Sequence, residues 1–383
     1  PATHRRQARG VGCGAAVLSV ANADSQGLLA LWTTLWLNDL VLNETGGNSQ
    51  LKACMESADG GLWVAVLNGL KRINRLRRWF WQSPPCYEMR GRCFQLKERC
   101  MGYPALHRDF QRRTGYSLRL DDPQTFHQKI TWLKIRRPPR QFVRAVNKAT
   151  AKELALDWAT RSGLSLTAAR TLAVVDDPSR IPWDQLPERF VLKATHRSGA
   201  NRFIDQRSPL DLHELNRTCR RWLDYPYGVF KHEWAYWSVP RRLLIEELIE
   251  PDSGAELLDY KFHMSRGACL MIQVNSGFRS GERRRSMVLP PWTPQPVSWL
   301  YPPPELDPVP PENFAEMMEL AQLFSSDCPY IRVDLYSLRR GGRSEILFGE
   351  FTYFPGSGSE PVDPVSFDRQ LGQSLHLSPS ECR

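Results

Sequence analysis

The sequence predicts an α+β fold, with helices and strands mixed along the chain rather than gathered around one parallel sheet. From about Phe94 onward, helical and strand signals alternate without long gaps. Two strand pairs are separated by short turns near Arg266 and Gly342, and such hairpins are typical of antiparallel sheets. The 383 residues are too many for one small core and indicate two or three packed lobes.

Each element follows from a local pattern. Asp121 and Pro123 are typical of a helix start, and Phe126, Ile130 and Leu133 then recur at helical spacing. Short apolar runs indicate buried strands. The other expected elements are a helix at residues 145–160, strands at 189–194 and 243–249, hairpins at 260–274 and 330–353, a Pro-rich connector at 302–311 and a helix at 313–324.

Positive charge is concentrated near the start of the chain. The net charge is +10, and residues 1–120 contain 17 Lys and Arg against 8 Asp and Glu, so the rest is nearly neutral. A nucleic-acid-binding core would spread basic residues over its working face, so this distribution argues against nucleic acid as a partner. With 42% apolar and 24% charged residues, the composition excludes a wholly disordered chain.

Residues 1–93 form a basic N-terminal extension for which the sequence predicts no clear structure. Within it, residues 71–81 place Ile73, Leu76 and Phe80 at helical spacing, with arginines on the other sides. Such a helix can lie on an anionic membrane surface or pack on the main body. No apolar run is long enough to cross a bilayer. We expect a cytoplasmic protein, with peripheral membrane contact through residues 71–81 as an alternative.

The nine cysteines do not form a recognisable framework. Their number is odd and they include no C-x-x-C pair, which argues against disulfides and against a structural zinc site. Cys86, Cys93 and Cys100 are seven residues apart and would lie on one side of a helix. We expect these thiols to be reduced and buried.

The hairpin at 330–353 carries the most chemical information. Alternate side chains of a strand point to opposite faces, so Arg332 shares a face with Asp334, and Glu350 shares one with Thr352. If the turn is symmetric about Gly342, Asp334 lies opposite Glu350 and Arg332 opposite Thr352. Opposed carboxylates repel, and Mg²⁺ is a natural ion to neutralise them. Solvated carboxylates or a salt bridge to Arg332 are the alternatives, and a one-residue change of register would separate the acids.

Weaker signals lie upstream. Lys193 ends a strand and is followed by Ser198 and Gly199, a combination that can bind phosphate through an ammonium group and backbone N–H groups. Two further pairs combine charge with a strand pattern: Glu246 with Glu247, which can frame an adenine edge or end a strand, and Asp259 with Lys261, which share a face.

Taken in order, these segments resemble the ATP-grasp superfamily. The series comprises Asn147-Lys148, Phe-Val-Leu-Lys193, Ile-Glu-Glu-Leu-Ile249, Asp-Tyr-Lys261, Arg332-Val-Asp334 and Gly-Glu350-Phe-Thr. The chain is similar to the TupA-like branch, named for teichuronopeptide biosynthesis, over about residues 94–375. The cues for this branch include Pro-Gln-Thr-Phe-His-Gln-Lys-Ile-Thr-Trp-Leu-Lys at 123–134, Lys-Ala-Thr-His-Arg-Ser-Gly at 193–199 and Gly-Glu-Phe-Thr-Tyr-Phe-Pro-Gly-Ser-Gly at 349–358.

The resemblance implies a nucleotide held between two α+β lobes, and a ligase that uses ATP and Mg²⁺ to join a carboxylate to an amine through an acyl phosphate. The implied nucleotide-binding residues are Lys148, Lys193, Ser198, Gly199, Glu246, Glu247, Leu248, Ile249 and, for the ribose, Glu256. The implied metal ligands are Asp334, Glu350 and Thr352, and the implied catalytic residues are Arg332 and Lys261.

The resemblance also divides the chain after the extension. It implies a helical region before the ATP site at 94–185, a small lobe with the phosphate loop and adenine hinge at 186–250, and a large lobe with the metal-binding hairpin at 251–383. In the phosphate loop, Arg197 and Ala200 stand where relatives have glycine. Arg197 either adds a phosphate contact or leaves the loop less able to close over ATP.

The expected function is therefore an ATP- and Mg²⁺-dependent carboxylate–amine ligase. Its acid substrate would be a carboxylate-bearing glycan or precursor, such as a uronic acid, in surface polysaccharide biosynthesis, and its co-substrate an amine. The alternatives are a glycosyltransferase-like polysaccharide biosynthesis protein and a non-catalytic nucleotide-binding interaction protein.

Overall fold

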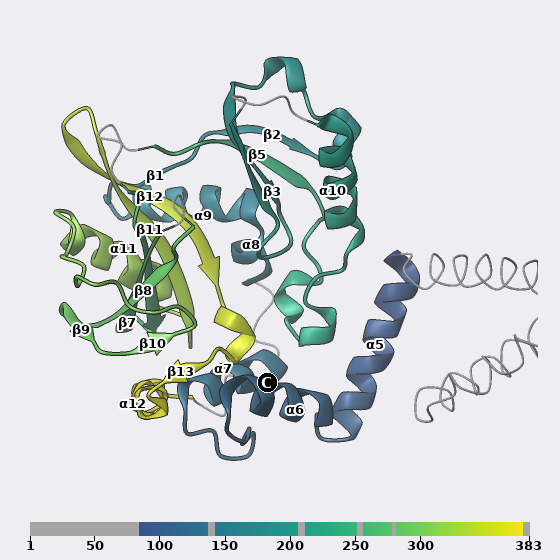
Figure 1. The fold of residues 1–383 in the computed structure, drawn as a ribbon, viewed down its shortest axis with the longest axis vertical. Coiled ribbons are helices and arrows are strands. Elements are labelled where there is room, and N and C mark those ends of the chain that lie inside the picture. Colours follow the sequence, from purple (N-terminus) through teal and green to yellow (C-terminus); the bar gives the residue numbers. More distant parts are fainter. Residues whose placement is uncertain (1–83, 137–141, 206–210, 251–255, 278–280, 378–383) are drawn as a thin grey trace, which may run out of the picture. The chain divides into compact units, whose positions relative to one another are not determined.

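The computed structural model describes residues 84–377, apart from residues 137–141, 206–210, 251–255 and 278–280. The chain divides into two compact units, Pro1–Trp79 and Phe80–Arg383, and every described residue belongs to the second unit. The predicted helix at 71–81 therefore lies outside the described residues. The α+β prediction is confirmed, because helices pack on two separate mixed or antiparallel sheets (Figure 1).

The larger sheet has seven strands in the order β1-β12-β11-β6-β7-β8-β9. Its strands are β1 (Thr167–Ala168), β6 (Asp259–Ser265), β7 (Ala268–Ser276), β8 (Arg284–Leu289), β9 (Thr293–Gln295), β11 (Ile331–Arg340) and β12 (Arg343–Thr352). Neighbouring strands are antiparallel except for β1, which runs parallel to β12. The hairpins predicted at 260–274 and 330–353 are thus both present, side by side.

One face of this sheet is apolar and the other is polar, because strand side chains alternate. Phe262, Val333 and Leu335 are fully buried on the apolar side. Helices α9 (Lys148–Arg161) and α11 (Phe314–Ser325) pack on the sheet and on each other, with the rings of Trp158 and Phe324 6.0 Å apart. The polar face is left for charged side chains, and these form the site described below.

The smaller sheet is antiparallel, with the order β2-β5-β3-β4. Its strands are β2 (Thr171–Val175), β3 (Arg189–Ala194), β4 (Asn201–Asp205) and β5 (Leu243–Glu247). Helix α10 (Leu212–Asp224) covers it, and Leu215 and Cys219 pack with Phe190 and Leu243 in a separate core. Because β2 belongs to this sheet, the sheet begins before the boundary expected at residue 186. The proposed division into domains stays a prediction.

Helix α7 (Phe126–Arg136) is present as predicted, but it begins at Phe126, so Asp121 and Pro123 lie before the helix and are not its starting residues. Thr125 and Gln128 form a capping box, in which the Thr125 hydroxyl accepts from the Gln128 N–H at 3.1 Å and the Gln128 side chain accepts from the Thr125 N–H at 3.2 Å. The remaining elements are α5 (Pro84–Cys100), α6 (Pro104–Thr114), α8 (Phe142–Val146), α12 (Val365–Ser374), β10 (Ser298–Trp299), β13 (Val362–Asp363) and the short 3₁₀ turns η2 (Pro178–Arg180), η3 (Trp183–Gln185), η4 (Val229–Lys231), η5 (Trp234–Tyr236) and η6 (Pro355–Gly358).

One expectation for the first described helix needs correction. Cys86, Cys93 and Cys100 do lie on α5, but Cys93 and Cys100 are exposed and Cys86 is only half-buried, because the opposite side of the helix faces the protein. Helix α5 runs without a break through residue 93, the expected end of the extension, and that boundary stays a prediction. None of the helices in the described part of the chain has the length and apolar character that a membrane span requires.

A β-bulge fixes the register of the β11–β12 hairpin. Arg340 pairs with Arg343 across a two-residue turn, so the turn is symmetric about the Gly341–Gly342 bond and not about Gly342 as expected. With that turn alone, Asp334 would face Gly349. Gly349 is instead left unpaired between two pairs, Asp334 with Glu350 and Leu335 with Phe348. The predicted opposition of Asp334 and Glu350 is therefore confirmed, through a bulge that the sequence argument did not include.

The bulge generates a stability prediction for Gly349. A Cβ atom at this position would lie 2.9 Å from the Asp334 carbonyl oxygen and 3.0 Å from a ring carbon of Tyr336. We expect Gly349→Ala to lower the free energy of unfolding by about 1–3 kcal/mol, as overpacking does, in urea denaturation. The control is Arg343→Ala, at an exposed position of the same strand. Equal stability of the two variants would contradict the role given to the bulge.

Candidate active site

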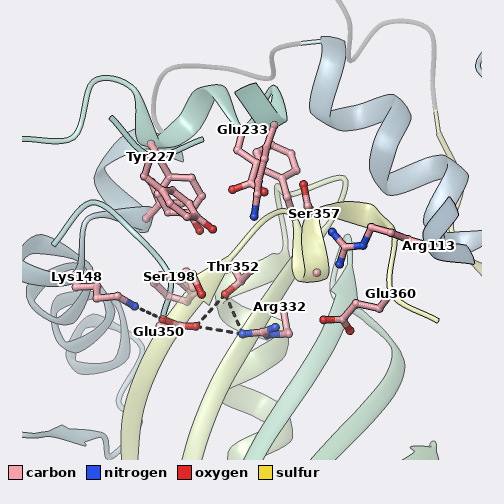
Figure 2. Close-up of a pocket in the computed structure, with 16 residues that line it drawn as sticks. Arg113, Lys148, Ser198, Tyr227, Glu233, Arg332, Glu350, Thr352, Ser357 and Glu360 are labelled. Atoms are coloured by element: carbon pink, nitrogen blue, oxygen red, sulfur yellow. Dashed lines mark hydrogen bonds and ion pairs between the residues drawn. The ribbon is translucent and has the colours of Figure 1, made fainter. Parts of the chain in front are cut away.

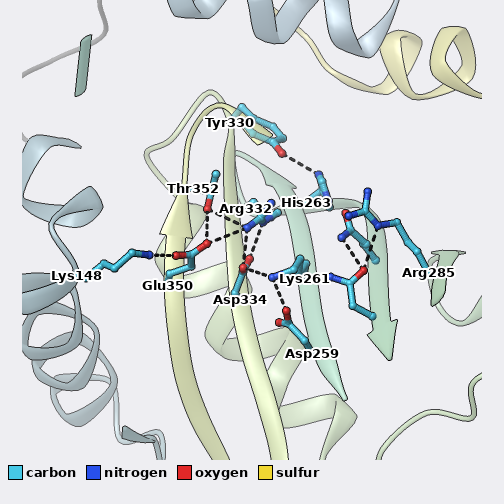
Figure 3. A network of polar contacts seen from close by, with 12 residues as sticks. Lys148, Asp259, Lys261, His263, Arg285, Tyr330, Arg332, Asp334, Glu350 and Thr352 are labelled. Carbon is cyan, nitrogen blue, oxygen red and sulfur yellow. Dashed lines mark hydrogen bonds and ion pairs between the residues drawn. The ribbon is translucent and has the colours of Figure 1, made fainter. Parts of the chain in front are cut away.

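Arg332 is the centre of a ladder of charged side chains on the polar face of the large sheet (Figure 3). Arg332 donates two parallel hydrogen bonds of 2.7 Å to Asp334, from Nε to Oδ1 and from Nη2 to Oδ2. Nη2 also lies 3.1 Å from Glu350 Oε1 and 3.0 Å from the Thr352 hydroxyl. The arrangement follows from register, because Arg332 faces Thr352 and Asp334 faces Glu350 across the hairpin.

The inner end of the ladder is buried. Lys261 on β6 faces Asp334 and forms ion pairs with Asp334 and, at 2.6 Å, with Asp259. Burial raises the pKa of Asp259, although Lys261 opposes the effect. Burial would lower the pKa of Lys261, but Asp259 and Asp334 raise it, so the ammonium stays charged. The two acids thus hold a buried cation in place.

Lys148 closes the outer end of the ladder. It is the first residue of α9, where the Asn147 side chain caps the helix by accepting from the Ala149 N–H at 3.1 Å. Its ammonium group forms an ion pair with Glu350, whose side chain is 32% exposed. Burial opposes ionisation of Glu350, yet Lys148, Arg332 and Lys261 together hold its pKa well below the usual range. Three cations and three carboxylates therefore alternate along the ladder.

A cavity of about 240 Å³ opens over the outer end of this ladder (Figure 2). Among the residues predicted for the site, Lys148, Ser198, Arg332, Glu350 and Thr352 line the cavity. Asp334 and Lys261 do not line it and lie beneath Arg332. The structure therefore brings the two hairpin acids together, but only Glu350 reaches the open space. Arg332 forms the salt bridge with Asp334 that was one of the alternatives considered from sequence, and the metal assignment stays a prediction.

The loop between β3 and β4 brings Ser198 to the cavity. Gly199 turns the chain with a φ of +71°, a conformation that glycine adopts without strain. Arg197 does not line the cavity. Its guanidinium group lies 5.1 Å from the ring of Tyr225 and 5.8 Å from that of Tyr227. Arg197, which replaces a glycine of the relatives, thus holds the loop against Tyr225 and Tyr227, which follow α10.

His196 supports the same attachment. Its Nε2 lies 3.2 Å from the Tyr225 carbonyl oxygen, and burial lowers the pKa of its imidazole to about 4. The neutral ring therefore acts as a structural hydrogen-bonding group between the loop and the segment after α10.

The other predicted nucleotide-binding residues lie outside the cavity lining. Glu246 is buried between Lys193, at 2.5 Å, and Lys152, and these two lysines lower its pKa although burial opposes them. Glu247 lies 3.4 Å from Arg170. The remaining three are Leu248 and Ile249, which are half-buried after β5, and Glu256, which is exposed and accepts from the Gly277 N–H.

Sequence reasoning missed a second wall of the cavity. Gly356, Ser357 and Gly358 follow β12 with φ values of +54°, +61° and +72°, so the non-glycine Ser357 is held in a left-handed conformation. Lys134 on α7 donates to the Ser357 carbonyl at 2.6 Å and to its hydroxyl at 3.0 Å. Lys134 is buried, and burial lowers its pKa to about 8.

Glu233 completes this wall. Its carboxyl group is buried on the cavity side, and burial raises its pKa although Lys134 and the Ser357 and Tyr227 hydroxyl groups oppose the effect.

The only sequence signal for Lys134 and Ser357 was that each stands in one of the branch-level motifs, at 123–134 and at 349–358. The contact between α7 and the turn η6 explains why the two motifs belong together.

Comparison with known families agrees with the motif order. A family model described as TupA-like ATPgrasp matches residues 128–376, well over half of the chain. The chain belongs to the TupA-like ATP-grasp family. The match begins within α7, includes the whole ladder, and ends two residues after α12. The fold expected from the resemblance, an ATP-grasp fold, is thereby shown.

Solved structures of ATP-grasp ligases are similar at low identity. The ligase PsnB complexed with a minimal precursor is 13% identical, with 61% of this chain and 60% of that chain covered and a TM-score of 0.32. D-alanine–D-alanine ligase from Helicobacter pylori is 14% identical, with 67% and 68% covered and a TM-score of 0.34. The TupA-like chain thus spans about 60% of the length of PsnB. No curated protein matches.

The donor atoms of this TupA-like site suit a hard divalent cation only in part. Glu350 and Thr352 line the cavity and Asp334 does not. Both oxygens of each carboxylate are engaged, those of Glu350 by Arg332 and Lys148 and those of Asp334 by Arg332 and Lys261. No cluster of three or more His, Cys, Asp and Glu side chains that could hold a metal occurs in the described ranges. Mg²⁺ commonly uses one or two carboxylates and takes its other ligands from water and nucleotide phosphates, and Glu350, alone or with Asp334, is within that range.

The ladder generates a stability prediction that separates its two acids. Asp334→Asn leaves Arg332 and Lys261 buried without enough negative charge, and we expect a loss of about 3–5 kcal/mol in the free energy of unfolding. Glu350→Gln acts at a partly exposed side chain, and we expect a loss of about 1 kcal/mol. Urea denaturation measures both variants. Similar small losses in the free energy of unfolding of both variants would show that the burial of Arg332 does not depend on the charge of Asp334.

Proposed function

We propose that this protein is an ATP-dependent ligase that activates a carboxylate and transfers it to an amine. The observation that carries the proposal is the ladder from Lys148 through Glu350 and Arg332 to Asp334, which places fixed positive charge at the floor of a cavity. Membership of the ATP-grasp family supports ATP as the energy source. Phosphoryl transfer depends on positioning and charge neutralisation, and this wall is suited to both.

The nucleotide would lie between the two sheets. We assign Lys148, Ser198 and Gly199 to the phosphates, because the first two line the cavity and Gly199 gives the loop its turn. Lys193 would join them by exchanging Glu246 for phosphate oxygens. The adenine and ribose assignments, which are Glu246, Glu247, Leu248 and Ile249 for the hinge and Glu256 for the ribose, rest on the family motif order alone.

Mg²⁺ would be held by Glu350 and Thr352, with Asp334 available once Arg332 releases one of its oxygens. The ion would neutralise the phosphate charge that accumulates at this end of the cavity. Arg332 is then free to bind the negative oxygen that develops on the acyl group. A planar guanidinium that already makes several directed hydrogen bonds is suited to that role.

The proposed reaction has two steps. A substrate carboxylate oxygen attacks the γ-phosphorus of ATP, which forms an acyl phosphate and releases ADP. The amine nitrogen then attacks the acyl carbon, the carbon–oxygen bond to phosphate breaks, and the amide, inorganic phosphate and one proton leave. Lys261 would hold Asp334, and through it Arg332, in position for both steps.

The acid substrate would be a carboxylate on a glycan or a glycan precursor, such as a uronic acid. This assignment comes from the TupA-like branch and its connection with polysaccharide biosynthesis, and not from a residue of the cavity. A glycosyltransferase-like role and a non-catalytic nucleotide-binding role are the two alternatives that the test below distinguishes.

The test measures ADP release with ATP, Mg²⁺ and panels of uronic acids and amines. We expect release that needs both co-substrates, and we expect Glu350→Gln to lower it at least about 100-fold because the metal ligand and the partner of Lys148 are lost. Glu345→Gln, on the same strand outside the cavity lining, is the control. Sugar transfer without ATP would support the glycosyltransferase alternative, and nucleotide binding without turnover the binding role.

The second wall generates a prediction about the acid substrate. Arg113 on α6 lines the cavity on the side away from Lys148 (Figure 2), and no salt bridge of Arg113 occurs among the described residues. We expect Arg113→Gln to raise the KM for the acid about tenfold or more, since hydrogen bonds to charged groups are strong. Arg112→Gln, at an exposed position paired with Asp109, should leave KM unchanged. An equal effect of the two substitutions would remove Arg113 from the site.

A further inference from the structure

Helix α5 has two faces of different character. Gly91, Gln95 and Glu98 are buried and Phe94 is half-buried, so one face packs on the body of the protein. The contacts are specific. Gln95 donates to the Val229 carbonyl at 2.6 Å, and a Cβ on Gly91 would collide with Val229. This face fixes the helix and determines which residues point outward.

The outward face is apolar along its centre. Met89 and Leu96 are 52% and 66% exposed, and Cys93 and Cys100 are exposed between and after them. Because an α-helix turns by about 100° per residue, these four side chains lie within one narrow stripe opposite the buried face. A solvated helix normally presents polar residues there. Met101, which follows the last residue of the helix, is also 60% exposed.

Basic residues border this stripe on both sides. By the same geometry, Arg92 and Arg99 lie along one border, and Arg90 and Lys97 along the other, and all four are exposed. The acids of α5 are used elsewhere: Glu88 forms an ion pair with Arg241, and buried Glu98 accepts from the Ala105 and Leu106 N–H groups. The exposed face of α5 therefore combines an apolar stripe with positive borders.

We propose that this outward face of α5 is a docking surface for a membrane that contains anionic lipid. An apolar stripe between two rows of basic residues lets a helix lie in the interfacial plane, with its apolar side chains among the acyl chains and its cations at the headgroups.

Charge argues against a second copy of this chain as the occupant. Two such helices packed stripe to stripe would bring Arg92, Arg99, Arg90 and Lys97 of one copy against the same cations of the other. An anionic lipid surface removes that repulsion. The inference is independent of the proposed ligase activity, because α5 contributes no residue to the cavity lining.

The test is sedimentation of the full chain with sucrose-loaded vesicles of phosphatidylcholine alone or with about 30% phosphatidylglycerol. We expect binding only to the anionic vesicles, and weaker binding as salt rises from about 0.05 M to about 0.5 M. Leu96→Glu should lower the partition coefficient at least tenfold. Arg92→Gln and Arg99→Gln should each lower it about fivefold, the loss expected when one cation leaves an anionic surface.

Matched variants distinguish binding through this surface from nonspecific binding by any exposed apolar side chain. Leu306→Glu replaces an apolar side chain that is 84% exposed but lies far along the chain, in the Pro-rich connector, and it should leave binding unchanged. Circular dichroism melting and nucleotide binding check that each variant is folded. The proposal is overturned if the wild-type chain does not bind anionic vesicles, or if Leu96→Glu binds as the wild type does. It is also overturned if light scattering shows a dimer that Leu96→Glu dissociates.

Discussion

The buried pair of Arg332 and Asp334 is the interaction on which the rest of the site depends. A guanidinium group removed from water must find its hydrogen-bond acceptors inside the protein, and Asp334 supplies two of them in parallel. Glu350 and Thr352 accept further hydrogen bonds from the Nη2 group of Arg332. The arginine is thereby fixed in one orientation, with its outer edge on the cavity, before any substrate is present. Positive charge held in place in this way is suited to stabilising negative charge that develops during a reaction.

The surrounding fold can be understood as support for that pair. The apolar face of the large sheet packs on α9 and α11, which leaves the opposite face to carry charge. Three adjacent strands then contribute alternating acids and bases, so that each buried charge has an opposite neighbour. Lys148 joins the same ladder from the first turn of α9. Helix α9, which packs on the apolar face of the sheet, therefore also supplies the cation of Lys148 to the polar face.

The two walls of the cavity differ in how they are held. The ladder wall depends on ion pairs within one sheet, whereas the opposite wall depends on a turn in a left-handed conformation that Lys134 and Thr131 hold from α7. Strain of this type persists only where neighbouring contacts impose it. The loop that carries Ser198 is fastened in a third way, by Arg197 against two tyrosine rings. An arginine in place of glycine is thus compatible with an ordered loop.

The sequence alone determined the α+β class, the positions of both hairpins, the family and the residue types of the ladder, because these depend on local periodicity and on the order of short motifs. It also placed Asp334 opposite Glu350, although by assuming a turn half a residue away from the real one. The bulge at Gly349, the pairing of both Asp334 oxygens and the second wall with Arg113, Glu233 and Ser357 came only from the tertiary structure. Each depends on contacts between residues distant in sequence, and such contacts leave no periodic signal. The exposure of Cys93 and Cys100 was decided in the same way, since a helix repeat identifies a side of the helix but not what that side faces.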